Sequence, residues 1–270
     1  MVAEALAERR RGPRRGFRAG SIVLAWVVGF VVLALALRGG LLGDPARWAR
    51  VWQRLPQLGW GFLDNVVMSI IGMVLATILG SLLGSLLLAR RAWLRWPATF
   101  VMNFLRNSPW LVLLFATLYL LPFRLQWGGW SVEFPPIAKA IIGLTLPTAA
   151  NFAEIIRGGV QSIHSGQWES ARSLGYTTTQ ILRRVVLPQA LRRILPGWMN
   201  LYALLMIATA LATVTGTQEV LTVLRTVLAT EPTGAIAYFY MAVLAMFFTY
   251  CYPIAWIARR LERASKGEAL

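Results

Sequence analysis

Residues 168–188 read WESARSLGYTTTQILRRVVLP, a polar, arginine-bearing stretch that separates two apolar runs. The apolar runs, at 137–156 and 194–214, are each long enough to cross about 30 Å of hydrocarbon as a helix. Gly175 interrupts the stretch, because glycine reaches backbone conformations that end a helix. The sequence therefore predicts a broken helical segment outside the membrane, where a soluble partner could dock on it.

The composition of the whole chain agrees with a membrane protein. Its 270 residues are 57% hydrophobic with a mean hydropathy of +0.59, well above an ordinary soluble domain. Apolar windows predict an all-α polytopic bundle of six membrane helices, at 21–37, 65–89, 100–121, 137–156, 194–214 and 235–257. Cys251 is the only cysteine and His164 the only histidine, which excludes an internal disulfide and argues against a metal site.

The net charge of +16 is explained by membrane topology. With the amino terminus in the cytosol, most arginines fall in the cytosolic segments, including the clusters at 9–18, 90–95, 183–193 and 259–263. The positive-inside rule then places both termini in the cytosol. We therefore expect anionic lipid, and not nucleic acid, to be the partner of this basic surface.

The amino-terminal 37 residues leave two alternatives open. Arginines at 9–18, an apolar run and Ala34-Leu35-Ala36 are the parts of a cleavable export signal, and Arg14-Arg15 also suggests a twin-arginine signal. The other interpretation, which we favour, is a retained signal anchor. In the linker that follows, tryptophans at 48, 52 and 60 predict a short interfacial helix at 46–55.

Polar residues inside the third and fourth spans are candidates for a solute route. Arg106 precedes Asn107-Ser108-Pro109 in an apolar run, so it either lines a polar interior or snorkels to the boundary, and Pro109 predicts a helix break. Glu154 is either part of the route or an ion-pair partner of Arg157 three residues on. With the hydroxyls of the fifth span, the candidate pathway residues are Arg106, Thr148, Asn151, Glu154, Thr209 and Thr213.

The second span carries Gly80 and Gly84 at the four-residue spacing that lets two helix backbones approach closely. The motif predicts a packing face. It leaves open whether the neighbouring helix belongs to this subunit or to a second one.

The 168–188 stretch resembles the EAA motif of ABC importer permeases. Glu169-Ser170-Ala171-Arg172-Ser173-Leu174-Gly175 is followed, after nine residues, by Val185-Val186-Leu187-Pro188. Ser170 and Val185 stand where the motif usually has alanine and isoleucine. The segments NFLRNSPWLVLL at 103–114 and AEIIRGGVQSI at 153–163 are similar to the polar-amino-acid class of these permeases. The resemblance runs from about residue 62 to the end of the chain.

The resemblance implies a permease subunit of a bacterial inner-membrane importer. The small residues at 170 and 171 would lie in a groove of an ATP-hydrolysing subunit, with Leu187-Pro188 ending the segment. The implied docking residues are Glu169, Ser170, Ala171, Arg172, Leu174, Gly175, Val185, Leu187 and Pro188. The implied partners are a second permease, ATP-binding subunits and an external solute-binding protein. Since the chain has no Gly-x-x-x-x-Gly-Lys-Ser/Thr sequence, ATP and Mg²⁺ are expected in the partner ATPase, with no cofactor and no catalytic residue here.

One departure from the class bears on the solute. Permeases of this class often carry a Lys-Asp pair before Thr-Ser in the fifth helix, where this chain has Ile207 and Ala208. If that pair contacts solute in the relatives, this subunit contributes less to recognition. We therefore expect a heterodimer in which the other permease supplies more of the site.

The sequence predicts, in order, a basic cytosolic arm at 1–20, an extra span with an external linker at 21–61, a permease core at 62–258 and a cytosolic tail at 259–270. The coupling loop is expected at 158–193. The expected cargo is an amino acid or a similar small polar solute. Two alternatives stay open, an importer for an osmolyte or opine and an ATP-independent channel.

Overall fold

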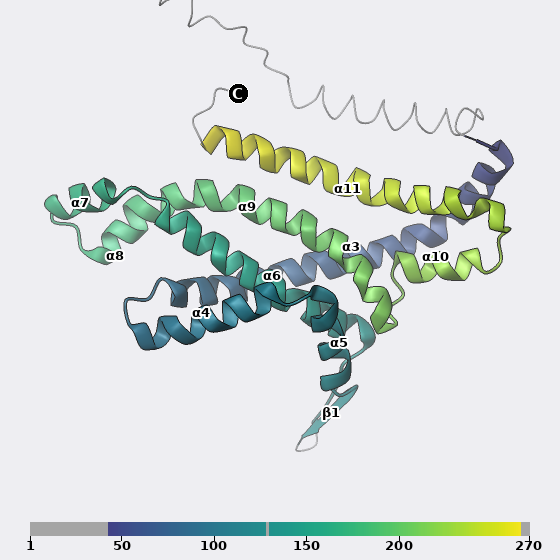
Figure 1. Cartoon of the computed structure of the whole chain (residues 1–270), viewed down its shortest axis with the longest axis horizontal. Coiled ribbons are helices and arrows are strands. Elements are labelled where there is room, and N and C mark those ends of the chain that lie inside the picture. The colour runs from purple at the N-terminus through teal and green to yellow at the C-terminus, as the bar shows by residue number, and fades with distance from the viewer. Residues whose placement is uncertain (1–42, 128–129, 266–270) are drawn as a thin grey trace, which may run out of the picture. The chain divides into compact units, whose positions relative to one another are not determined.

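The computed structural model describes residues 43–127 and 130–265 (Figure 1). The predicted basic arm and the predicted first span, 21–37, lie outside the described residues. The chain divides into two compact units, one ending at Trp52 and one beginning at Gln53, and each is described by itself.

Helix α3 spans Pro45–Leu87 and contains the predicted second span. The expected interfacial helix at 46–55 is not a separate element, because these residues are the beginning of α3. Pro56 lies inside the helix and does not end it. The part of the predicted external linker that follows residue 44 is therefore helical.

The predicted break in the third span is confirmed. Helix α4 spans Ala92–Asn107 and helix α5 spans Trp110–Leu120, with Ser108 and Pro109 between them in extended conformation. The Ser108 hydroxyl donates to the Phe104 carbonyl oxygen at 2.7 Å, which satisfies one of the last carbonyls of α4. An antiparallel hairpin of β1, Arg124–Trp127, and β2, Trp130–Glu133, follows α5.

Helix α6, Pro136–Gln161, packs against α4, α5 and α9. The α3 residues Gly80 and Gly84 face α6, so the neighbouring helix of this motif belongs to the same subunit. A Cβ at Gly80 would lie 2.7 Å from the Ala149 carbonyl oxygen, and one at Gly84 would lie 3.1 Å from Ile156 Cβ. Both glycines therefore let α3 approach α6 within the same subunit.

From α6 to residue 265 the chain is mostly helical, with short connections. After α6 come α7, Ser165–Ser173; α8, Thr178–Ile181; a π-helical turn η1, Leu182–Val186; α9, Leu187–Ala208; a 3₁₀ segment η2, Thr209–Thr215; α10, Val220–Leu228; a 3₁₀ turn η3, Thr233–Ala235; and α11, Ile236–Ser265. Helix α9 packs against both α6 and α11.

Three helical runs in the described part of the chain are long and apolar enough to cross a membrane, namely Pro45–Leu87, Thr178–Thr215 and Thr233–Ala264. Helix α5 is a shorter apolar helix. The predicted fourth span corresponds to α6, whose charged side chains lower its mean hydropathy, so composition alone does not mark it. The number of six spans stays a prediction.

Candidate functional site

The segment from His164 to Pro188, here called the elbow, joins α6 to α9. It begins with α7, whose first turn is capped by His164, because the His164 Nδ1 accepts a hydrogen bond from the Gly166 backbone N–H at 3.1 Å. The only histidine of the sequence is thus a helix cap.

The α7 helix ends in a Schellman motif. The Gly175 N–H donates to the Arg172 carbonyl oxygen at 2.9 Å, and the Tyr176 N–H donates to the Ala171 carbonyl oxygen at 3.1 Å. Gly175 has a φ of +78°, the left-handed conformation that this motif requires. A Cβ at Gly175 would meet no atom within 4 Å, so backbone conformation and not space selects the glycine.

A capping box starts the next helical run. The Thr177 hydroxyl accepts from the Gln180 N–H at 3.3 Å, and the Gln180 side chain accepts from the Thr177 N–H at 2.8 Å. The change of direction therefore lies at residues 174–177, between the end of α7 and the start of α8.

The expectation that Leu187-Pro188 ends a segment is wrong. Helical structure continues from Thr178 to Thr215, and Pro188 lies in the first turn of α9. Proline has no N–H and its ring clashes with the carbonyl four residues earlier, so the preceding turn must widen. The π-helical turn at Leu182–Val186 is this widened turn, in which the Leu187 N–H donates to the Leu182 carbonyl oxygen.

Burial divides the predicted docking residues into two groups. Glu169, Ser170, Arg172, Leu174, Gly175, Leu187 and Pro188 are exposed, and the Leu174 residue is 76% exposed. Ala171 is 4% exposed and packs in the core with Ile181 and Val186, so its side chain faces the interior of this subunit, and its part in docking stays a prediction. One face of α7 packs against this subunit, and only the opposite face is exposed to a partner. Val185 is half-buried.

One side-chain contact joins the two helices that flank the elbow, and a second reaches the elbow itself. The Arg193 guanidinium donates to the Ser162 carbonyl oxygen at 3.1 Å, at the end of α6. The Arg90 guanidinium donates to the Thr178 hydroxyl at 3.3 Å, at the start of α8. Both contacts are exposed.

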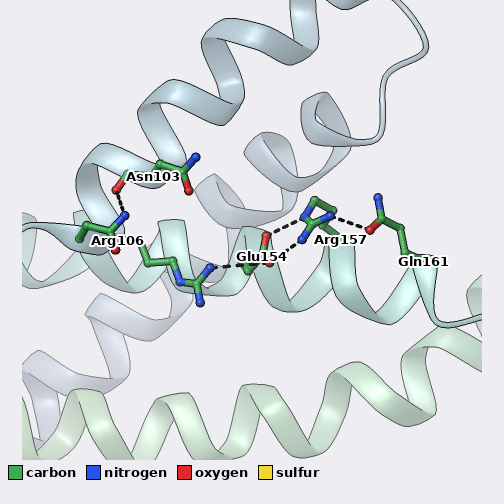
Figure 2. Close-up of polar contacts among 6 residues, drawn as sticks. Asn103, Arg106, Glu154, Arg157 and Gln161 are labelled. Atoms are coloured by element: carbon green, nitrogen blue, oxygen red, sulfur yellow. Dashed lines mark hydrogen bonds and ion pairs between the residues drawn. The ribbon is translucent and has the colours of Figure 1, made fainter.

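A second group of predicted residues meets between α4 and α6 (Figure 2). Arg157 donates through Nε and Nη2 to the two oxygens of Glu154, each at 2.7 Å, and through Nη1 to Gln161 Oε1 at 2.6 Å. Arg106 lies at the end of α4, and its Nη1 is 3.6 Å from Glu154 Oε1. The predicted pairing of Glu154 with Arg157 is confirmed, and Arg106 joins the same carboxylate.

This cluster carries an excess positive charge beside an open surface. Two guanidinium groups share one carboxylate, and the side chain of Arg106 is 42% exposed, against 22% for Glu154. The bidentate bonds leave Arg157 occupied, whereas most of the Arg106 guanidinium stays available as a hydrogen-bond donor.

The other predicted pathway residues are placed less favourably. Thr148 and Thr209 are fully buried, and their hydroxyls donate to the carbonyls of Leu144 and Met206 at 2.6 and 2.7 Å. Their hydroxyls therefore bond to carbonyls of the preceding turn of their own helices, and a role of these two residues in a route stays a prediction. Asn151 is half-buried and donates to the Pro147 carbonyl at 2.8 Å. Thr213 is half-buried, and its hydroxyl lies 3.1 Å from that of Thr222.

The burial of several polar side chains was not predicted, among them Asn65, Lys139 and Glu219. Asn65 and Glu219 meet between α3 and α10, and Lys139 donates to the carbonyl oxygens of Leu118 and Leu121 at 3.0 and 2.6 Å. The Lys139 ammonium also lies 3.4 Å from the centre of the Phe123 ring. Of the three, only Glu219 could have been identified from its neighbours in the sequence. It stands directly before the apolar run that becomes α10, which is the position of a helix cap, and it caps that helix.

The chain is similar to known permease proteins in sequence. It is 33% identical over 204 residues to a probable glutamine ABC transporter permease of Bacillus subtilis (strain 168), covering 75% of this chain and 90% of that protein. It is 30% identical over 241 residues to an octopine transport system permease of Rhizobium radiobacter, covering 82% and 93%. A probable amino-acid ABC transporter permease of Bacillus subtilis (strain 168) is 37% identical over 134 residues, and the chain spans 57% of that relative's length.

Two solved structures share the fold. An amino acid ABC transporter crystallised with histidines superimposes with a TM-score of 0.69 at 22% identity, covering 78% of this chain and 95% of that one. The MetNI methionine ABC transporter in an inward-facing conformation gives a TM-score of 0.63 at 21% identity, covering 83% and 99%. These likenesses show the all-α membrane fold.

A family model also matches most of the described chain. It covers residues 76–267 and is described as the binding-protein-dependent transport system inner membrane component. The match contains α4 to α11, including the elbow and the Arg106–Glu154–Arg157 cluster. The protein is therefore a membrane protein that belongs to the family of inner membrane components of binding-protein-dependent transport systems.

Proposed function

We propose that this chain is the membrane permease subunit of an ATP-driven importer for an amino acid or a similarly small polar solute. The elbow carries the proposal, because it presents an ordered polar face whose sequence resembles the EAA motif. The glutamine and octopine permeases named above support the solute class, since each is named for an amino acid or a derivative of one.

The exposed face of the elbow is the proposed ATPase contact. Leu174 projects beyond the end of α7, with Glu169 and Arg172 on the exposed surface of the same helix. An apolar side chain surrounded by charges is suited to a groove in a soluble protein. The buried side of the elbow is formed by the packed side chains of Ala171, Ile181 and Val186. Movement of the partner would therefore be transmitted to α9 through these side chains.

The Arg106–Glu154 cluster is the proposed solute-contacting region, with Asn151 one turn from Glu154 on α6 and Thr213 further along the route. Arg106 has unoccupied guanidinium donors, which match a carboxylate group of the solute. Arg157 holds Glu154 in a fixed position through two hydrogen bonds, so Glu154 in turn positions Arg106.

The second permease is proposed to be a different chain. Ile207 is 54% exposed and Ala208 is half-buried, so an apolar surface stands where the related class often carries a Lys-Asp pair. The complementary subunit would supply the missing polar contacts. ATP and Mg²⁺ would bind the ATPase subunits, and an external solute-binding protein would deliver the cargo to a complex in the bacterial inner membrane, with both termini of this chain in the cytosol.

The proposal is tested by reconstituting this chain in proteoliposomes with candidate ATPase, second-permease and solute-binding subunits. Uptake of labelled amino acids, glutamine and octopine among them, and ATP hydrolysis would be measured together. We expect solute-dependent hydrolysis and ATP-dependent uptake. Passive flux without an ATPase subunit would contradict the proposal, and activity of this chain alone with the ATPase would contradict the heterodimer.

The elbow is tested with two variants that differ only in charge. Gly175→Asn and Gly175→Asp place side chains of equal size at a position with positive φ, which both residues tolerate. We expect Gly175→Asn to retain most ATPase association, and Gly175→Asp to lose at least about tenfold, because the carboxylate would be desolvated in the contact. Equal behaviour of the two variants would contradict docking at this surface.

A further inference from the structure

A buried polar network joins α3 to the segment that follows α9. Asn65 and Glu219 are both 0% exposed, although they are separated by most of the described chain. The Asn65 amide donates to the Thr209 hydroxyl at 2.9 Å and to Glu219 Oε2 at 3.3 Å. The Asn65 amide oxygen accepts from the Val220 N–H at 3.0 Å. One side chain of α3 therefore contacts η2, the α10 cap and the α10 backbone.

The Glu219 carboxylate accepts its other hydrogen bonds from the first turn of α10. Its Oε1 accepts from the Thr222 N–H at 2.8 Å and from the Thr222 hydroxyl at 3.1 Å, while its Oε2 accepts from the Leu221 N–H at 2.9 Å. Within the described residues this carboxylate forms no salt bridge. Its charge is held by the first N–H groups of α10 and by Asn65, and burial makes each of these contacts costly to break.

A second anchor lies one helix length away. Arg54 Nε donates to Glu231 Oε1 at 3.1 Å, just beyond the end of α10. Arg54 and Asn65 are as far apart in α3 as Glu231 and Val220 are in the other segment, so α10 runs antiparallel to α3 between the two anchors. The Arg54 side chain is 37% exposed and that of Glu231 is 9% exposed.

Between the anchors the two backbones are nearly in contact. A Cβ at Gly61 would lie 2.9 Å from Val223 Cγ2 and 3.0 Å from Val220 Cα. The absent side chain of Gly61 is therefore what lets α10 lie directly on α3. We call the set Arg54, Gly61, Asn65, Glu219, Val220, Val223 and Glu231 the α3–α10 seam.

We infer that Asn65 and Glu219 are positioning residues that join α3, η2 and α10 into one rigid unit, and that the change of access during transport occurs outside this unit. The second part of the inference, which concerns where access changes, rests on the proposed function. Separating α10 from α3 would break the Asn65–Glu219 hydrogen bond and leave the Val220 N–H and the Asn65 amide oxygen buried without their partner, so the two helices move together. Thr209 and Thr213, which the network holds through Asn65 and Thr222, move with them.

Amide hydrogen exchange of the purified full-length complex tests the rigid unit without requiring transport. Glu219→Gln keeps the shape of the side chain but replaces one acceptor with a donor that faces other donors. We expect at least tenfold faster exchange in both 220–224 and 61–66, and no change in the elbow. Faster exchange confined to 220–224 would overturn the joining of α3 to α10. Gln218→Glu is the matched control, since Gln218 is exposed beside Glu219.

A chemical crosslink tests where access changes. In a Cys251→Ala background, Arg54→Cys and Glu231→Cys are bridged by a bifunctional thiol reagent that spans the former ion pair. We expect the crosslinked complex to retain at least half of the ATP-driven uptake of the unbridged variant. Uptake reduced to the ATP-free level by the bridge would overturn the inference. Absence of ATP-driven uptake in the wild-type complex would instead count against the proposed function, and the exchange result would still decide whether the unit is rigid.

Discussion

The elbow and the α3–α10 seam lie at opposite ends of α9, and they are held together in different ways. The elbow relies on bonds between residues close in sequence, such as the His164 cap, the Schellman motif at Gly175 and the Thr177–Gln180 box. The seam relies on Asn65 and Glu219, which meet across 154 positions of the chain. A surface that must adapt to another protein is built locally, whereas a unit that must stay closed is built from distant, buried partners.

The largest expected effect breaks the seam. Asn65→Leu keeps a similar volume but leaves the buried Val220 N–H without its partner, and it removes one donor each from the Thr209 hydroxyl and from Glu219 Oε2. Each buried polar group that loses its partner costs about 1–3 kcal/mol. We expect a lower thermal unfolding midpoint and poorer recovery of folded protein in detergent. Gln218→Leu, at an exposed position, controls for added apolar surface. Unchanged thermal stability of Asn65→Leu would show that the network contributes little.

A smaller effect is expected at the elbow from Gly175→Ala. The left-handed conformation costs a residue with a Cβ about 1–2 kcal/mol. Because α7 is short and mostly exposed, we expect faster amide exchange across 171–176 with an unchanged unfolding midpoint. Gly158→Ala is the matched control, since Gly158 is also exposed with open space at its Cβ but is helical. A drop in the unfolding midpoint equal to that of Asn65→Leu would show that the elbow contributes as much to global stability as the seam does.

The smallest effect is expected from Thr177→Ala. Loss of the capping hydroxyl removes one half of the box, which costs about 1 kcal/mol of local helix stability. We expect faster exchange of the Gln180 amide alone, and Thr177→Ser should restore it. Exchange that spreads into α9 would contradict the prediction, because it would show that the cap stabilises more than the first turn of α8.

Local rules account for what the sequence predicted correctly. Pro109 marked the break between α4 and α5, and the three-residue spacing of Glu154 and Arg157 marked their ion pair. The resemblance to the EAA motif located the elbow, but it could not tell that Ala171 faces inward, because that depends on how α7 packs. Pro188 indicated a stop, whereas the preceding turn absorbed the strain by widening.

The remainder depended on contacts that no local pattern encodes. Asn65 follows Asp64 at the start of an apolar run, and nothing nearby identifies Glu219 as its partner. Thr148 and Thr209 have the residue type expected of a polar route, and only their burial separates the two interpretations. The hairpin had a usable signal in Gly128-Gly129, a dipeptide typical of tight turns between strands.

The buried Lys139 has a consequence for how the protein is made. Helix α5 has 11 residues and is about 17 Å long, little more than half of the hydrocarbon thickness. The carbonyls of Leu118 and Leu121 at and just beyond its end obtain their donor from the first turn of α6. Since lipid offers no donors of its own, α5 alone would be a poor substrate for the insertion machinery. We expect the two helices to leave the translocon as a pair, because the Lys139 ammonium group supplies the hydrogen bonds that the end of α5 lacks on its own.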